Sequence, residues 1–528
     1  MLIRYVVAVV FAVLASAATA VEPKISIGNS HVLLLKTDGT VWAWGSNGYS
    51  QLGTGGSSTG TPTQVPGLTG VVDVVAKPNS FSMALKADGT VWVWGNVSDG
   101  RSGISGLSGG QFYSVPTKVP AVQQMVSIAS NFSGFAALAV DTNGQVWSWG
   151  KGDSGELGDG LSTTRGNPQP VAGLSNVVRL ATSNQAVLAL RADGSVVGWG
   201  YNGNGSTADN MLAGKKGANI IGPSVLNVPP LASIEAASSN TSGQFFGIDA
   251  QGRPLIWGDT NSGLLSCNQV SGSASASLSQ PYTPTGLSGI TQIAGGSVYA
   301  LFLTQGGQVL GCGYNGNGEL GDGTTISTGF SNTPSKPGPV ITGGLPTSLF
   351  SVAAGTYSSA ALDNSGGVYT WGRASDHLSG QGDGTLPSSN TSAVKLSINA
   401  GAIAGAPATF AGTQSGALSK ATVDVGVAVA PAHVGQNGQI YLAAQLPNGA
   451  LLLLDANGNF VPYDPTKIFP ALYKGQLPKR FPKNLTRDID LSGVSGVSLI
   501  MGYGLGSGAA ADADMLTNNR YSVLLQLK

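Results

Sequence analysis

The sequence predicts an all-β protein, a seven-bladed β-propeller followed by a small β-sandwich-like C-terminal domain. Three observations support this fold class. One pattern of Trp and Gly recurs seven times in the first 400 residues. Glycine accounts for 79 of 528 residues, about twice the usual ~7%, which indicates many tight turns. Charged residues make up 10% of the chain, and the 26 basic residues balance the 26 acidic ones, so the basic surface of a nucleic-acid-binding protein is not expected.

The first 20 residues have the pattern of a bacterial export signal. Arg4 precedes an apolar stretch from Tyr5 to Ala17, and Ala18-Thr19-Ala20 matches an A-x-A cleavage site. The apolar stretch is shorter than the ~20 residues that span a bilayer. We therefore expect residues 1–20 to be removed and the mature chain to carry no membrane span. The protein is expected to be exported, to the periplasm, the cell surface or the medium.

The recurring pattern ends in a glycine, which provides seven anchors for alignment. The anchors are Gly45, Gly95, Gly150, Gly200, Gly258, Gly313 and Gly372. They lie 50 to 59 residues apart, and another glycine lies six residues before each of them. The clearest copy is Asp38-Gly39-Thr40-Val41-Trp42-Ala43-Trp44-Gly45. Repetition at this period is typical of solenoids and propellers.

Each part of a copy predicts a local structure. Alternating apolar residues such as Leu33 and Leu35 indicate a strand, and Asp38-Gly39 turns the chain because Gly adopts positive φ without strain. The Val-Trp-x-Trp run predicts a second strand, apolar and expected to be buried on both faces. Segments such as 62–65 supply the remaining strands. Seven sheets of about four strands can bury their faces by packing around an axis, so we expect a propeller over residues 21–399. An open solenoid or a β-sandwich is the alternative.

The motif Asp-Gly-x-Val-Trp-x-Trp-Gly-x-Asn-x-x-Gly-x-Leu-Gly resembles the regulator of chromosome condensation repeat. Its best copies are Thr37 to Gly53 and Asn143 to Gly158, and Tyr314 to Gly321 matches the second half. The resemblance implies a seven-bladed propeller that acts by protein contact, since family members include nucleotide-exchange factors and a secreted bacterial β-lactamase inhibitor. The fourth copy lacks Leu-Gly after residues 202–205, and the sixth has Cys312 in place of Trp.

The pattern changes after the repeats. Residues 400–420 are rich in Ala, Gly, Ser and Thr and are predicted to form a linker. Residues 421–528 contain no Trp and no repeat, and they predict a β-rich domain with a short helical turn at Met515 and Leu516. The expected strands are 422–430, 440–446, 450–454, 460–463, 497–503 and 521–527. This domain resembles a C-terminal module of exported proteobacterial proteins, and we expect it to cap or dock the propeller.

Residues suited to catalysis or metal binding are scarce. The three histidines, His31, His377 and His433, lie far apart and in unrelated contexts, so we predict no catalytic centre and no His-based metal site. We expect His31 to be a packed or rim residue. The Gly-Asp-Gly segments predict turns, and structural calcium is their alternative. These segments are 158–160, 321–323 and 382–384.

Two cysteines lie in neighbouring repeats. An exported protein meets an oxidising environment, which favours a disulfide between Cys267 and Cys312. Cys312 also occupies a position that is Trp in most other copies, so a packed thiol is the alternative. Both interpretations remain open at this point.

The residue after each anchor glycine varies widely, unlike the anchor itself. These residues are Ser46, Asn96, Lys151, Tyr201, Asp259, Tyr314 and Arg373. Repeat symmetry should place them in a ring on one face of the propeller. The mixture of aromatic, cationic and anionic groups suits a recognition surface, and unselected variation at turns is the alternative.

Together these features predict an exported, non-catalytic scaffold whose propeller-face loops bind a protein or a cell-envelope component, without a cofactor. Guanine-nucleotide exchange, implied by the family resemblance, is one alternative. The export signal argues against it, because small GTPases and their nucleotides are cytosolic. An enzyme with a site in the propeller mouth is the other, and the scarcity of histidine argues against that. Neither nucleic acid nor membrane is an expected partner.

Overall fold

The protein is described here by a computed structural model. The residues it describes are 21–104, 112–131, 135–202, 219–236, 244–258, 278–284, 287–327, 340–383, 387–402, 409–415, 421–428, 436–448, 450–455, 459–464, 467–476, 480–489, 497–517 and 521–527.

Within these residues, seven four-stranded antiparallel sheets follow one another along the chain, each built from four consecutive strands. The first strands of the sheets are β1 (Lys24–Ile27), β5 (Val71–Lys77), β9 (Met125–Ser130), β13 (Val177–Thr182), β17 (Ser233–Ala236), β21 (Ile290–Gly295) and β25 (Leu349–Ala354). The second strands are β2 (His31–Leu35), β6 (Phe81–Lys86), β10 (Ala136–Asp141), β14 (Ala186–Arg191), β18 (Gln244–Ile248), β22 (Tyr299–Thr304) and β26 (Ser358–Asp363). The third strands are β3 (Val41–Gly45), β7 (Val91–Asn96), β11 (Val146–Gly150), β15 (Val196–Gly200), β19 (Pro254–Gly258), β23 (Val309–Gly313) and β27 (Gly367–Arg373). The fourth strands are β4 (Thr59–Gln64), β8 (Phe112–Lys118), β12 (Arg165–Pro170), β16 (Ile220–Val225), β20 (Leu278–Tyr282), β24 (Val340–Ile341) and β28 (Ser389–Asn399).

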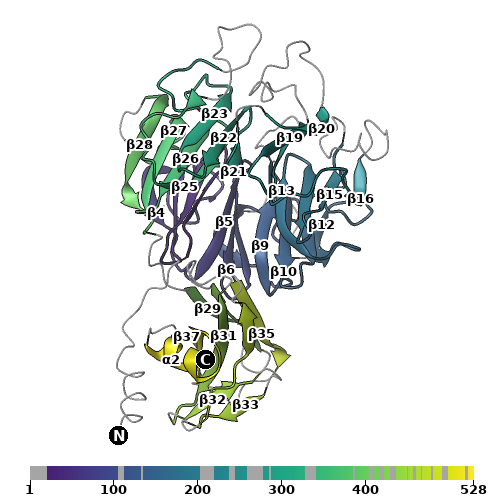
Figure 1. Cartoon of the computed structure of the whole chain (residues 1–528), viewed down its shortest axis with the longest axis vertical. Helices are drawn as coiled ribbons and strands as arrows, with labels where there is room; N and C mark the ends of the chain where they lie inside the picture. Colours follow the sequence, from purple (N-terminus) through teal and green to yellow (C-terminus); the bar gives the residue numbers. More distant parts are fainter. Residues whose placement is uncertain are drawn as a thin grey trace.

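The seven sheets are the blades of a closed propeller (Figure 1). Each first strand contacts the first strand of the next blade, and β25 of blade 7 contacts β1 of blade 1. The first strands therefore surround the axis, and the fourth strands lie at the outer edge. The expectation of about four strands per repeat is confirmed, and the closed ring excludes the open solenoid.

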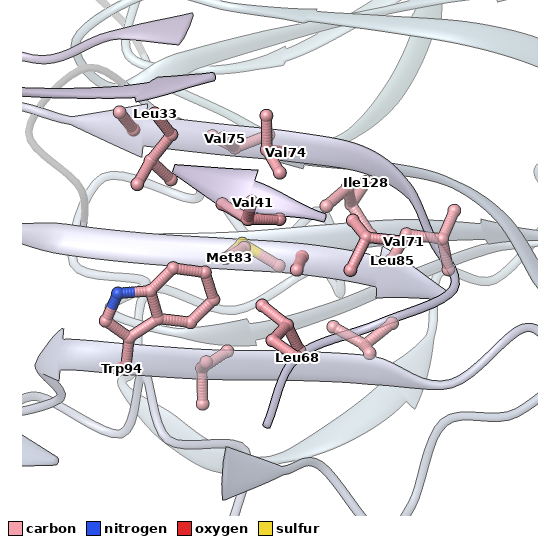
Figure 2. Packing of buried hydrophobic residues seen from close by; sticks show 14 of the residues in the cluster. Leu33, Val41, Leu68, Val71, Val74, Val75, Met83, Leu85, Trp94 and Ile128 are labelled. Atoms are coloured by element: carbon pink, nitrogen blue, oxygen red, sulfur yellow. The ribbon is translucent and has the colours of Figure 1, made fainter. Parts of the chain in front are cut away.

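Apolar side chains fill the space between neighbouring blades. Figure 2 shows this packing at blades 1 and 2, where Leu33 and Val41 lie in one cluster with Met83, Leu85 and Trp94. The second Trp of each motif is almost fully buried. The first Trp, in contrast, is only half-buried, so the expectation that both faces of this strand are buried is wrong for it. Its indole ring meets solvent at the blade edge, where lysine side chains cover it in blades 1 and 2.

The anchor glycines are required by backbone geometry. Gly45 has φ of +115°, and a Cβ placed on it would collide with the carbonyl oxygen of Ser30. The turn glycine Gly39 has φ of +73° between β2 and β3. L-residues rarely adopt such angles, which explains why glycine recurs at both positions.

The C-terminal part contains two sheets that share one apolar core. Strands β29 (Thr409–Ser415), β30 (Ala421–Ala428) and β35 (Arg480–Ile489) form the first sheet. The second sheet contains β31 (Asn437–Gln445), β32 (Leu451–Leu454), β33 (Phe460–Pro462), β34 (Tyr473–Gln476), β36 (Ser498–Leu505) and β37 (Tyr521–Gln526). Buried Val425 of the first sheet lies in one cluster with Leu442 and Met501 of the second. We call this part the C-terminal module.

Two expectations for this region need correction. The segment predicted as a linker, 400–420, contains strand β29, which pairs along its length with β30. Strand pairing uses backbone groups, so a segment of small polar residues can add a strand that composition does not reveal. The helical turn expected at Met515 and Leu516 is part of a longer helix, α2 (Ala509–Thr517).

Candidate functional site

The two faces of the propeller differ in the segments that form them. The turns between second and third strands, such as Asp38-Gly39, lie on one face, which we call the turn face. The first strands end on the other face, which we call the loop face, because the segments joining first to second and third to fourth strands lie there.

The predicted ring residues take equivalent places on the loop face. In six blades the N–H of the ring residue donates to the carbonyl of the residue just before the second strand, as Lys151 does to Phe135 at 2.7 Å. The six are Ser46, Asn96, Lys151, Tyr201, Tyr314 and Arg373. All six side chains are half-buried. Asp259 lies outside the described residues, so its place in the ring remains a prediction.

Several ring side chains are held by neighbours on the same face. The Lys151 amine lies 3.4 Å from Asp153 and 5.0 Å from the centre of the Phe135 ring. The Tyr314 ring meets the Tyr357 ring of the next blade edge to face, with centroids 6.5 Å apart. Such fixed aromatic and cationic groups are the residue types that concentrate binding energy in protein interfaces.

Two other ring residues are more deeply committed to their own loops. The Asn96 side-chain oxygen accepts hydrogen bonds from the backbone and hydroxyl of Ser98 and from Arg101. Arg373 donates to Ser375 and Asp376. Asn96 therefore shapes its loop, and less of its polarity remains for a partner.

The loops of the loop face are tied to the next blade by the buried tryptophans. Trp94 of blade 2 donates its indole N–H to the carbonyl of Gln51 in blade 1, at 2.9 Å. Trp149, Trp199 and Trp371 make the same bond to the preceding blade. Trp44 of blade 1 donates to Leu378 of blade 7 at 3.1 Å, so this bond also closes the ring. We call each of these bonds a tryptophan latch.

Two latches are missing between the middle blades, as far as the described residues show. Trp257 is fully buried, and its indole nitrogen has no hydrogen-bond partner in the described part of the chain. Cys312 is also fully buried and stands where blade 6 would have this Trp. Its proposed disulfide partner, Cys267, lies outside the described residues, so the bridge remains a prediction.

Acidic residues that were not predicted from the sequence shape these loops. Glu156 and Glu319 are buried, and each carboxylate accepts the backbone N–H two residues before it. Burial raises the pKa of both carboxyl groups above the usual value. Gln51 takes the same place in blade 1 and makes the same bond. The signal was available, since all three precede Leu-Gly in the motif.

The two described histidines, His31 and His377, make contacts that support the fold. His31 is fully buried, and its Nε2 donates to Ser82, because the Ser82 hydroxyl itself donates to the Gln51 carbonyl. Burial lowers the His31 pKa to about 3, so the ring is neutral. His377 lies 3.1 Å from Asp383 at the junction of blades 7 and 1. His433 lies outside the described residues.

No group of three or more potential metal ligands occurs among the residues described by the structure. In the Gly-Asp-Gly turns, Asp159 pairs with Arg165, and Asp322 accepts a hydrogen bond from Thr324. Asp383 accepts the backbone N–H of Gly60. Asp159 and Asp322 thus serve their own loops, whereas Asp383 joins blade 7 to blade 1.

A central channel of about 1200 Å³ runs between the first strands. Ion pairs join neighbouring blades inside it: Lys24 lies 2.6 Å from Asp73, and Arg179 lies 3.0 Å from Glu235. The channel wall therefore combines these ion pairs with apolar side chains such as Ile27, Val75 and Ile128.

The C-terminal module lies on the turn face. The chain leaves the ring there, since the Thr37 N–H donates to the carbonyl of Ala400. Strands β29 and β35 contact β5 and β9, and Tyr473 lines the channel together with the turn 141–144. Figure 1 shows the module beside β6, β9 and β10. The module therefore leaves the loop face available for other contacts.

The comparisons place this architecture among known proteins. Residues 24–51, 38–85 and 143–190 match the regulator of chromosome condensation (RCC1) repeat. The chain carries RCC1 repeats and has an RCC1-like propeller fold. The structure resembles yeast RCC1 (Prp20) bound to Kap60, with a TM-score of 0.56 and 20% identity over 72% of this chain and 86% of that one. It also resembles human WBSCR16, with a TM-score of 0.53 and 22% identity over 65% of this chain and 87% of that one. At this identity the likeness concerns the fold alone.

Sequence relatives share the repeats in different settings. Human HERC2, an E3 ubiquitin-protein ligase, is 28% identical over 284 residues, which are 50% of this chain and 5% of HERC2. Pim1 of Schizosaccharomyces pombe is 28% identical over 255 residues, 46% of each protein. Mitochondrial RUG3 of Arabidopsis thaliana is 35% identical over 105 residues, 20% of this chain and 23% of RUG3. The chain thus spans less than half the length of these relatives. No helix among the described residues has the length and hydropathy of a membrane span.

Proposed function

We propose that this protein is an exported, non-catalytic interaction scaffold whose loop face binds a protein or a component of the cell envelope. One observation carries the proposal. Six side chains, which include hydroxyl, amide, aromatic and cationic groups, occupy equivalent, half-exposed positions on the loop face, whereas the C-terminal module lies on the opposite face. Variation at fixed geometric positions is what a repeat scaffold needs to adapt to one partner. Export and a periplasmic, surface or secreted location are part of this proposal and rest on residues 1–20.

Site-specific cross-linking tests the binding face. A photoreactive residue is placed at Tyr201 or Tyr314, and control proteins carry it at Val115 or Val225, which are exposed on outer strands. The proposal expects the same cross-linked partner from both loop-face positions and from neither control. Cross-links of equal yield at the outer strands would contradict it.

Charge reversal gives a second test with a matched control. Lys151→Glu and Arg373→Glu should each weaken the partner's affinity by about tenfold or more, because each places a negative charge where the proposed binding face carries a positive one. Arg253→Glu changes an exposed, ion-paired arginine on the turn face and should leave affinity unchanged. N-terminal sequencing of the secreted or periplasmic fraction tests export, because cleavage after Ala20 makes Val21 the first residue.

Guanine-nucleotide exchange is the second candidate, and the RCC1-like fold is the observation that favours it. It requires an unprocessed, cytosolic protein. Cell fractionation therefore separates the two functions directly.

A further inference from the structure

The junction between blades 7 and 1 differs from the others in how the chain joins its two sides. We call the junction between two neighbouring blades a seam. From blade 1 to blade 7, the chain passes from the fourth strand of one blade to the first strand of the next through a short connector, such as residues 65–70 or 171–176. Blade 7 is the last blade and blade 1 the first, so no connector crosses their seam. Contacts such as the Trp44 latch, rather than a continuous chain, close the ring there.

The connectors also pack the seams that they cross. Val65 of one connector and Leu68 of the same connector are buried in the apolar cluster shared by blades 1 and 2. Val171 is buried in the cluster shared by blades 3 and 4. The end of this connector also accepts a backbone hydrogen bond from the following blade, as the Asn176 carbonyl does from the Ala192 N–H at 2.9 Å. A connector thus supplies both apolar contact and a hydrogen bond.

The segment that leaves blade 7 takes the place of a connector. Ala400 directly follows β28 and is fully buried, and its N–H donates to the carbonyl of Gly366 in the turn of blade 7 at 2.7 Å. The Ala400 carbonyl accepts the N–H of Thr37 in blade 1 at 2.8 Å. Gly401 packs so closely on Thr37 that a Cβ would collide with the threonine hydroxyl. Residues 400–401, which we call the exit segment, therefore tie blade 7 to blade 1.

The C-terminal module holds the far end of the exit segment. The chain continues from this segment into the module, where β29 contacts β5 of blade 2 and β35 contacts β9 of blade 3. Tyr473 of the module lines the channel between the blades. Figure 1 shows the module against this face of the ring. The module therefore links the end of blade 7 to blades 2 and 3 across the turn face.

We propose that the C-terminal module is a brace that keeps the propeller closed at the seam between blades 7 and 1. Chain ends fray unless they are tied down, so docking of the module on blades 2 and 3 holds the exit segment against Thr37. The brace also acts on the opposite face, because Ser46 and Arg373 belong to the two blades that meet at this seam. Their spacing depends on its closure, whereas the brace itself does not depend on the partner proposed above.

Native-state hydrogen exchange of the full chain tests the brace at individual amides. Two amides report on the seam between blades 7 and 1: the Thr37 N–H, and the Gly382 N–H, which donates to the carbonyl of Gly60 in blade 1 at 3.0 Å. Two amides at the seam between blades 3 and 4 are matched controls. They are the Ala192 N–H and the Gly160 N–H, which donates to β16 of blade 4 at 2.9 Å.

Two substitutions inside the module unfold it at a distance from the seam. Leu442→Asp places a charge in the core of the module, where Leu442 is fully buried, and Gly504→Ala forces a collision with the Ala511 carbonyl of α2. Limited proteolysis of the full chain identifies the variant whose module has unfolded. In that variant, exchange at Thr37 and Gly382 should rise by about tenfold or more, while exchange at the two controls changes by less than about twofold.

The pattern of exchange decides the proposal. Unchanged exchange at Thr37 and Gly382 in a variant with an unfolded module would overturn it. An equal rise at all four amides would also overturn it, because the module would then stabilise the whole ring rather than one seam.

The exit segment is tested separately, with the module intact. Gly401 has φ of +89°, and Gly401→Ala should raise exchange at Thr37, because the added Cβ collides with the Thr37 hydroxyl. Gly173 lies in the connector between blades 3 and 4 and has φ of +70°, with no atom close to the position of a Cβ. Gly173→Ala is thus a matched control that should leave exchange at Thr37 unchanged. Unchanged exchange at Thr37 in Gly401→Ala would show that the exit segment does not hold the seam.

Discussion

The tryptophan latches lead to a quantitative prediction from two matched substitutions, Trp94→Phe and Trp257→Phe. Both indole rings are fully buried between blades, and both substitutions remove the same atoms. The packing loss is therefore similar, and the hydrogen bond makes the difference. Trp94→Phe removes a bond to the Gln51 carbonyl, which keeps its bond from Ser82, so the added cost is about 1 kcal/mol. Trp257→Phe removes a buried donor that has no partner in the described ranges of the chain, and it recovers about 1 kcal/mol or more.

The Trp94 variant should thus be less stable than the Trp257 variant by about 2 kcal/mol. Urea unfolding followed by far-UV circular dichroism measures this difference. With a slope of about 3 kcal/mol/M, the two midpoints should differ by about 0.7 M. Equal midpoints, or a lower midpoint for Trp257→Phe, would show that the latch does not contribute as the geometry indicates.

Three further predictions concern pH, redox state and the C-terminal module. His31 stays neutral when folded but is protonated below its ordinary pKa of 6.5 when unfolded, so stability should fall as the pH drops from 6.5 towards 3, by up to about 1.4 kcal/mol per pH unit. In urea titrations, His31→Phe should not show the loss of stability that the wild type shows between pH 6.5 and 5. Equal losses of stability in the variant and the wild type would refute the reasoning. Peptide mapping without reductant should recover Cys267 and Cys312 in one linked peptide, whereas two alkylated free thiols would exclude the bridge. Gly504→Ala should destabilise the C-terminal module by roughly 1–3 kcal/mol, because a Cβ there collides with a carbonyl of α2, and limited proteolysis should then cleave this module before the propeller.

The positions of most candidate site residues could be predicted from the motif, but the contacts of their side chains could not. The equivalent backbone bonds of Lys151, Tyr314 and the other described ring residues follow from the repeat itself, since each copy ends its third strand at the same glycine. The aromatic pair of Tyr314 and Tyr357 was not predicted, because it joins two blades and depends on how the blades pack. The commitment of Asn96 to its own loop has the same origin.

The sequence alone determined the number of repeats, the strands within each and the positions of the obligatory glycines. These features are local, because alternation, turns and positive φ involve residues a few positions apart. Tertiary structure decided the contacts across blades: it brings Trp44 to Leu378, 334 positions away, and it leaves the indole of Trp257 without a hydrogen-bond partner among the described residues. Such contacts exist only once the ring has closed, since closure brings side chains of separate repeats within bonding distance and excludes water from them.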